Sequence, residues 1–85
     1  MRFPAEINQA PVTAGVYILE NADRTTNHVW HTDNLQQELR RIANLAADPR
    51  KDASEFSCEV IPDPKERERR ARELLHTLKP TTQEE

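Results

Sequence analysis

The chain has 85 residues, and a chain of this length has room for one hydrophobic core and therefore for one domain. Hydrophobic residues make up 35% of the sequence and charged residues 32%, so we expect that core to be small. The net charge of −3 at pH 7 argues against a protein that binds polyanions indiscriminately.

Cysteine usage and hydropathy narrow the cellular setting. The single cysteine, Cys58, excludes a framework of intrachain disulfides and fits a reducing compartment. The apolar runs are too short to cross a membrane, and the first ten residues contain no apolar segment of a secretory signal. We therefore expect a cytoplasmic protein.

The first half of the chain is predicted to form a hairpin and then a helix. The segment "GVYILEN", residues 15–21, is rich in β-branched and aromatic residues, which is typical of a strand. A polar turn follows, and "HVWHT", residues 28–32, is the predicted returning strand. Thr32 or Asp33 is the expected N-cap of the helix.

That helix carries one apolar stripe at helical spacing. The stripe consists of Leu35, Leu39, Ile42 and then Leu45 or Ala46. Arg40 and Arg41 lie off this stripe. The segment "AADPRKDAS" is expected to end the helix, because Pro49 disfavours its continuation.

The second half repeats the order of strand and helix. In "SEFSCEVIPD", residues 54–63, Phe56, Cys58 and Val60 share one face of a predicted strand. Asp63 followed by proline is a strong helix start, and the helix is expected to run to about Lys79.

These elements define the expected fold and its boundaries. The fold class is α/β (α+β): a small sandwich of a three-stranded antiparallel sheet flanked by helices, in the order β-β-α-β-α. Residues 1–10 are an N-terminal extension, residues 11–80 form the domain, and residues 81–85 are a flexible acidic tail.

The last helix begins with a run of charge, "KERERRAR", at residues 65–72. Its five cations are Lys65, Arg67, Arg69, Arg70 and Arg72. A basic face on an acidic protein favours a chosen contact with nucleic acid or with an acidic protein. The alternative is a solvated helix face whose charges pair with each other.

Several landmarks together resemble the GIY-YIG endonuclease family. They are "GVY" at residues 15–17, the step of eleven residues from Tyr17 to His28, the dipeptide Asn34-Leu35 that opens the helix, and Lys79-Pro80 near the end. The resemblance spans roughly residues 11–83, and it implies the fold just described.

The resemblance also implies a reaction, the hydrolysis of a phosphodiester with one divalent cation, Mg²⁺ or Mn²⁺. In the family two tyrosines lie beside the attacking water, an arginine neutralises the phosphate and a glutamate holds the metal. Carried over by position, these residues are Tyr17, His28, Glu38 and Ala71, while Trp30 replaces a glycine and Gln83 an asparagine.

These replacements predict that catalysis is lost and that no cofactor is needed. Glu38 places a negative charge where the phosphate needs a positive one, and Ala71 offers no oxygen to a metal. A rearranged site would need His28 as the base, Glu68 as a weak candidate metal ligand, and Arg40 or Arg41 at the phosphate.

A zinc site formed by His28, His31 and Cys58 is not expected. Two residues three apart on a strand point to opposite faces of the sheet, and Cys58 is most simply a small core residue.

Three functions follow as hypotheses. The first is a catalytically silent GIY-YIG-like domain that binds nucleic acid or a protein assembly through Trp30, Arg40, Arg41 and the cations of residues 65–72. The second is a metal-dependent DNA endonuclease with a rearranged site that uses Tyr17 and His28. The third is a structural subunit, such as a homodimer, whose former cleft has become an interface. No membrane partner is expected.

Overall fold

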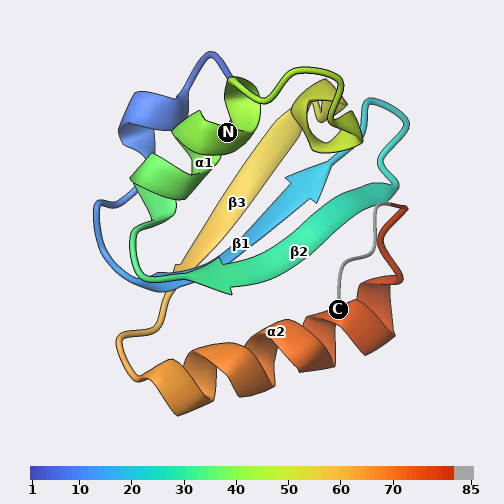
Figure 1. Cartoon of the computed structure of the whole chain (residues 1–85). Coiled ribbons are helices and arrows are strands. Elements are labelled where there is room, and N and C mark those ends of the chain that lie inside the picture. Colours follow the sequence, from blue (N-terminus) through green and yellow to red (C-terminus); the bar gives the residue numbers. More distant parts are fainter. Residues whose placement is uncertain (82–85) are drawn as a thin grey trace.

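The structure, a computed structural model, describes residues 1–81. Its sheet consists of β1 (Gly15–Glu20), β2 (Thr26–Thr32) and β3 (Glu55–Val60) in the order β2-β1-β3, with both pairs antiparallel. The helices are α1 (Leu35–Ala43) and α2 (Pro64–Leu78), and two short 3₁₀ helices, η1 (Ile7–Gln9) and η2 (Pro49–Asp52), complete the fold. The predicted order β-β-α-β-α is confirmed (Figure 1).

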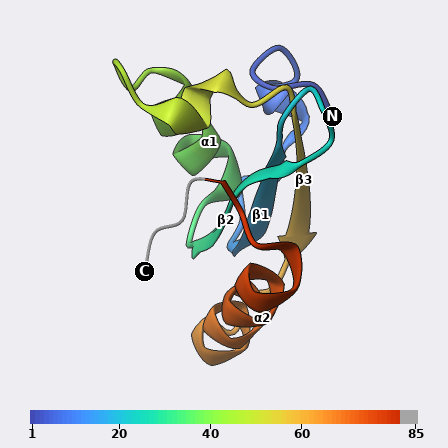
Figure 2. The same ribbon diagram turned by 90° about the vertical axis from the view of Figure 1, so that its right-hand side faces the viewer.

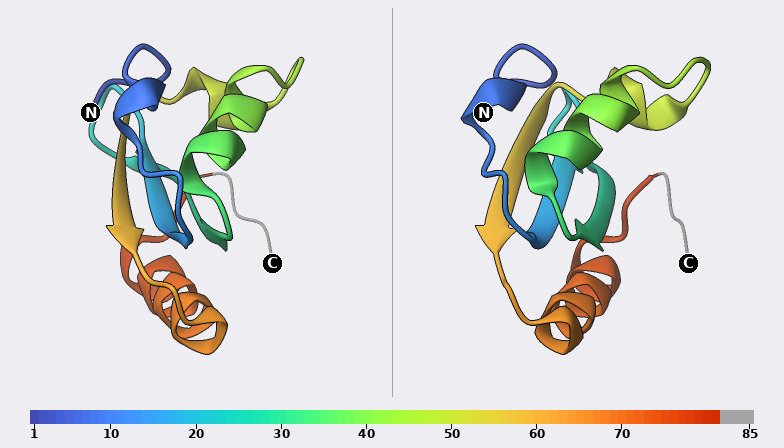
Figure 3. Two further views of the ribbon diagram at one scale, coloured as in Figure 1. Left: turned by 90° about the vertical axis from the view of Figure 1, so that its left-hand side faces the viewer. Right: turned by 60° about the vertical axis from the view of Figure 1, so that its left-hand side comes forward.

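The two helices cover opposite faces of the sheet, as Figures 2 and 3 show from the side. Because side chains alternate along a strand, β1 serves two cores. Tyr17 and Leu19 pack on the face that α1 covers, whereas Val16 packs with α2 on the other face. The core on the α1 face also contains the leucines of α1 and Phe56 of β3. Within residues 1–81 no helix is long and apolar enough to cross a membrane.

The predicted N-terminal extension contributes to the core on the α1 face. Phe3, Ile7 and Ala10 are buried there, and the N–H of Phe3 donates to the carbonyl of Ser54 at 2.8 Å. A domain boundary at residue 11 stays a prediction, and it would divide this core. The predicted tail lies outside the described residues except for Thr81, whose N–H donates to the carbonyl of Thr26 at 2.9 Å. Gln83 also lies outside them.

The helix ends follow the cap rules with one correction. Asn34, and not Thr32 or Asp33, caps α1, since its side chain accepts a hydrogen bond from the N–H of Gln37 at 3.0 Å. Thr32 is instead the last residue of β2, and its hydroxyl oxygen accepts from the N–H of Asn34 at 3.2 Å. The helix also ends earlier than expected, at Ala43.

The helix that begins at Asp63-Pro64 is confirmed. The Asp63 carboxylate accepts a hydrogen bond from the N–H of Glu66 at 3.0 Å, as an N-cap does. Lys79 closes the helix in the left-handed conformation, with φ of 50°. The sequence pattern placed this end within one residue.

Gly15 is required by the close approach of β1 to β3. A Cβ atom at this position would overlap the carbonyl oxygen of Glu59 and would lie 2.9 Å from Cδ1 of Leu35. The glycine of "GVY" thus has a packing role where β1, β3 and α1 meet.

Candidate active site

The centre of the candidate site is Tyr17, in the middle strand of the sheet. Its hydroxyl donates to Oε2 of Glu38 at 3.4 Å. Its ring lies beside that of His28, with centroids 5.8 Å apart and planes tilted by 41°. The structure therefore brings together three of the four residues that the resemblance placed in one site, and Ala71 is not among them. Both Tyr17 and His28 are fully buried, each with 0% exposure.

Glu38 is held by the next turn of its own helix. Arg41 donates to both carboxylate oxygens, from Nε at 3.1 Å and from Nη2 at 2.7 Å. These bonds from Arg41 lower the pKa of Glu38, against the effect of partial burial, and the charge of Arg50 lowers it further. Glu38 is therefore a stable anion beside the Tyr17 hydroxyl.

Arg50, which the sequence analysis did not single out, lies near the same place. It belongs to η2, and its side chain is only 14% exposed. Its Nη2 lies 2.8 Å from Oδ2 of Asp48, and hydrogen bonds from Arg50 lower the pKa of Asp48 to about 2. Asp48 also caps η2 by accepting from the N–H of Arg50. The Asp-Pro dipeptide at residues 48–49 was the available signal, because the same pair opens α2.

Asn27 holds η2 against the sheet. It is 3% exposed, and its Nδ2 donates to the carbonyl of Pro49 at 3.2 Å and to Oδ1 of Asn21 at 2.8 Å. These bonds join β2, the β1–β2 turn and η2, the short helix that carries Arg50.

Trp30 lies on the outer strand β2, directly opposite Tyr17 on β1. It is half-buried and packs against both cores. The neighbouring His31 ring lies 4.8 Å from it, centroid to centroid. Burial lowers the pKa of His31, and the charge of Arg67 lowers it further. A binding role for Trp30 stays a prediction.

The described residues do not fit the divalent metal that the resemblance implies. Ala71 has 0% exposure and packs with Val16 and Val29, on the face of the sheet opposite to Tyr17. Glu68 accepts hydrogen bonds from Arg72 on the exposed side of α2, with Nη2 at 3.0 Å. Within residues 1–81 no three His, Cys, Asp or Glu side chains gather as ligands would.

A shared zinc site is also inconsistent with the geometry. His28 faces α1 whereas His31, three residues on, points to the α2 face, as their partners on β1 show. Cys58 is half-buried against the core on the α1 face, and burial raises the pKa of its thiol to about 11. This thiol is a core group and a poor ligand.

The cations of α2 are largely engaged by carboxylates. Arg69 pairs with Glu66 and Arg72 with Glu68, each at 3.0 Å. Arg70 donates to both oxygens of Glu59 on β3, at 2.9 and 3.0 Å.

Of the remaining cations, Arg67 donates to the carbonyl of Pro62 at 2.8 Å, and Arg40 on α1 donates to Oδ1 of Asn8. These contacts favour the alternative of a helix face whose charges pair with each other.

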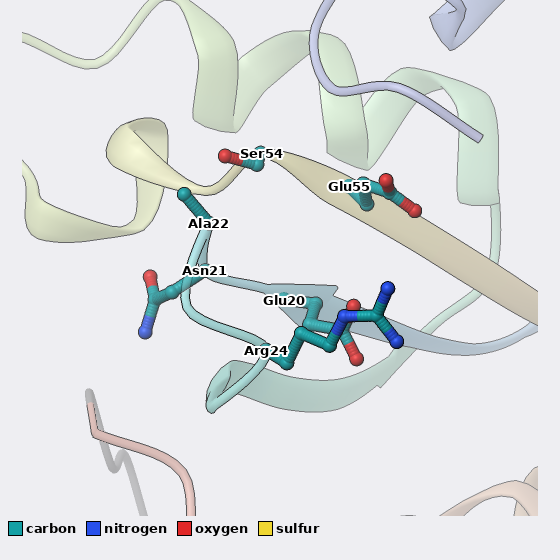
Figure 4. Close-up of a pocket in the computed structure, with 6 residues that line it drawn as sticks. All are labelled: Glu20, Asn21, Ala22, Arg24, Ser54 and Glu55. Atoms are coloured by element: carbon teal, nitrogen blue, oxygen red, sulfur yellow. The ribbon is translucent and has the colours of Figure 1, made fainter.

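A pocket of about 410 Å³ lies where β1 ends and β3 begins (Figure 4). Its lining is polar and comes from the β1–β2 turn and the start of β3. The residues are Glu20, Asn21, Ala22, Arg24, Ser54 and Glu55. None of the residues predicted for the site lines it.

The fold is that of a GIY-YIG endonuclease domain. The N-terminal endonuclease domain of UvrC from Thermotoga maritima, in two point-mutant forms bound to its catalytic divalent cation, superposes with TM-scores of 0.80 and 0.79. Each comparison covers 95% of this chain and 93% of the other, at 21% identity.

The magnesium-bound form of the same domain gives a TM-score of 0.75 at 22% identity, with 89% of each chain covered. No protein-family model and no curated protein matches this chain. The GIY-YIG resemblance is confirmed at the level of the fold.

Proposed function

We propose that this chain is a catalytically silent GIY-YIG-fold domain that acts as a binding module for a protein assembly. The observation that carries the proposal is the ion pair of Glu38 and Arg41 beside the Tyr17 hydroxyl, with Arg41 Nη2 at 2.7 Å from Glu38 Oε2. In a nuclease of this fold, the resemblance places a phosphate-binding arginine at position 38.

The charge at this position opposes phosphodiester hydrolysis. Negative charge develops on the phosphoryl oxygens in the transition state, and catalysis requires cations directed at them. Glu38 has a lowered pKa and is ionised at neutral pH, and Arg41 is already bound to it in two-point geometry. A phosphate entering here would lie beside the Glu38 carboxylate, and the neighbouring cation, Arg41, is already bound to that carboxylate.

Access is a second obstacle. Tyr17 and His28, the candidate water-activating groups, have 0% exposure. A general base must come within hydrogen-bond reach of the proton that it removes. The buried rings are therefore better suited to packing than to proton transfer.

The charge balance favours a protein partner over nucleic acid. Nucleic-acid binding depends on cations that neutralise phosphates, and Arg69, Arg70 and Arg72 are paired with carboxylates in this chain. The overall charge is −3. A surface of mixed charges with a half-buried tryptophan is more typical of a contact with another protein.

A cleavage experiment tests the proposal directly. Wild type and Tyr17→Phe are incubated with supercoiled plasmid and with branched DNA in Mg²⁺ or Mn²⁺. We expect no product from either protein. Metal-dependent cleavage by the wild type that disappears in Tyr17→Phe would overturn the proposal, and it would favour the rearranged nuclease that uses Tyr17 and His28.

A binding experiment tests the choice of partner. Fluorescently labelled duplex and branched DNA are titrated with the protein at several salt concentrations. We expect no saturable binding at physiological salt. Tight binding that weakens steeply with salt, and that is lost when Lys65 and Arg72 are replaced with glutamine, would identify nucleic acid as the partner.

A further inference from the structure

We propose that the outer edge of β3 beyond Phe56 is a self-association surface, at which the β3 strand of a second copy of this chain pairs antiparallel. Two three-stranded sheets would thereby join into one continuous sheet. The inference rests on the edge of the sheet alone, so it holds whether or not the domain is catalytically silent.

The first half of this edge is already covered by the chain itself. β3 is an outer strand, since β1 lies in the middle of the sheet. The N–H of Phe56 donates to the carbonyl of Met1 at 2.8 Å, and the terminal amino group donates back to the carbonyl of Phe56 at 3.1 Å. Beside them, the main chains of Arg2 and Glu55 form an isolated antiparallel β-bridge.

The second half of the edge has no such cover. Alternate residues of a strand direct their N–H and C=O groups to the same side, so Cys58 and Val60 share the outward direction of Phe56. Within residues 1–81 no main-chain hydrogen bond reaches these groups from outside the sheet. An edge of this kind is a template for another strand.

One register satisfies all of these groups by two-fold symmetry. If Cys58 lies opposite Val60 of the second copy, the two N–H and two C=O groups of each chain pair with those of the other. Registers shifted along β3 are disfavoured in both directions. In one direction the N–H and C=O of Phe56 are already bonded to Met1, and in the other Pro62 has no N–H to donate. The symmetric register is therefore the favoured one.

The side chains at this edge suit a second copy. Val60 is 53% exposed, although it is a large apolar residue on a strand, and in this register it would contact Cys58 of the second copy on the α1 face. Strand pairing would remove its surface from water. Val60 thus gives the pairing an apolar contact in addition to hydrogen bonds.

The two central Glu59 residues would face each other on the α2 face, and like charges directly opposite destabilise a strand pair. Each Glu59 carries its own counter-charge, because Arg70 binds both of its oxygens, with Nε at 2.9 Å. Arg70 is 33% exposed. The pairing with Arg70 therefore reduces the repulsion between the two Glu59 carboxylates.

Sedimentation of the full chain over a range of concentrations tests the proposal. We expect the wild type to form dimers and Val60→Lys to weaken dimerisation at least tenfold. The control is Val12→Lys, because Val12 is also exposed, at 66%, but lies outside β3. Circular dichroism checks that each variant is folded. A monomer at every concentration, or a dimer that Val60→Lys leaves unchanged, would overturn the proposal.

A disulfide experiment tests the register. In a Cys58→Ser background, Glu59→Cys places one thiol directly opposite its copy, whereas Ser57→Cys places it on the same face but out of register. We expect a disulfide-linked dimer under mild oxidation only for Glu59→Cys. Equal linkage of the two variants, or linkage of the Ser57→Cys variant alone, would contradict this pairing.

Discussion

The Tyr17 hydroxyl on β1 lies 3.4 Å from the Glu38 carboxylate on α1. This partly buried bond joins the sheet to the helix. Tyr17 is the residue that this chain shares with the GIY-YIG motif, whereas Glu38 stands where the motif has an arginine. Arg41 binds both oxygens of Glu38. At the position where the resemblance implies a phosphate-binding arginine, this chain has a carboxylate that is bound to Arg41.

Returning a cation to position 38 is not expected to create an enzyme. Glu38→Arg would place a third guanidinium near Arg41 and Arg50, and we expect it to lower the free energy of unfolding by about 1–3 kcal/mol. No metal ligand is restored, so plasmid nicking should stay absent. Urea unfolding and a nicking assay check both parts, with Glu38→Gln as the uncharged control. Metal-dependent nicking by Glu38→Arg would show that only the arginine is missing.

The Tyr17 hydroxyl is expected to matter less than its ring. Tyr17→Phe removes the long hydrogen bond to Glu38 and leaves Glu38 bound to Arg41, so we expect a loss of about 1–2 kcal/mol. Tyr17→Ala opens a cavity at a fully buried position and should cost about 3–5 kcal/mol. Chemical denaturation measures both. Similar losses for the two variants would mean that the hydroxyl, and not packing, dominates.

Asp48 predicts a specific dependence of stability on pH. The hydrogen bonds from Arg50 lower its pKa to about 2 in the folded chain, from an ordinary value of 3.8. A carboxylate with a lowered pKa stabilises the fold above its unfolded pKa, and this contribution is lost as the pH falls through the folded pKa. The stability difference between wild type and Asp48→Asn should therefore shrink between about pH 4 and pH 2. A difference that is constant over this range would contradict the Asp48–Arg50 pair.

Gly15 is expected to tolerate no side chain. A Cβ would overlap the Glu59 carbonyl, which is main chain and cannot move aside by a rotamer change. We expect Gly15→Ala to destabilise the fold by about 1–3 kcal/mol through overpacking. Ser57→Ala, at an exposed position of β3, is a control that should change stability by less than about 0.5 kcal/mol. Thermal unfolding compares the two.

Restoring a glutamate at position 71 is expected to damage the fold. Ala71 is fully buried against Val16 and Val29, and an unpaired carboxylate in an apolar core should cost about 3–5 kcal/mol. Thr77→Glu on the exposed side of α2 is the matched control and should be nearly neutral. A stable Ala71→Glu protein whose melting temperature rises with Mg²⁺ would indicate that position 71 reaches a metal site.

Local patterns in the sequence determined the elements, their order and one face of each. The spacing of Leu35, Leu39 and Ile42 predicts the buried side of α1, and Asp63 with its proline predicts the start of α2. Both depend on neighbours within one or two helical turns. The landmarks from "GVY" to Lys79-Pro80 were enough to predict a GIY-YIG-like fold.

The tertiary structure decided which charges are paired and how far the core extends. Arg50 reaches the surroundings of Glu38 because Asn27 holds η2 to the sheet, and Arg70 is neutralised by Glu59, eleven positions earlier on β3. Phe3 is buried in the core on the α1 face, and its N–H donates to the carbonyl of Ser54. Such contacts join residues far apart in the chain, and no local periodicity encodes them. The sequence therefore predicts which groups are charged, whereas the fold decides which of them remain available to a partner.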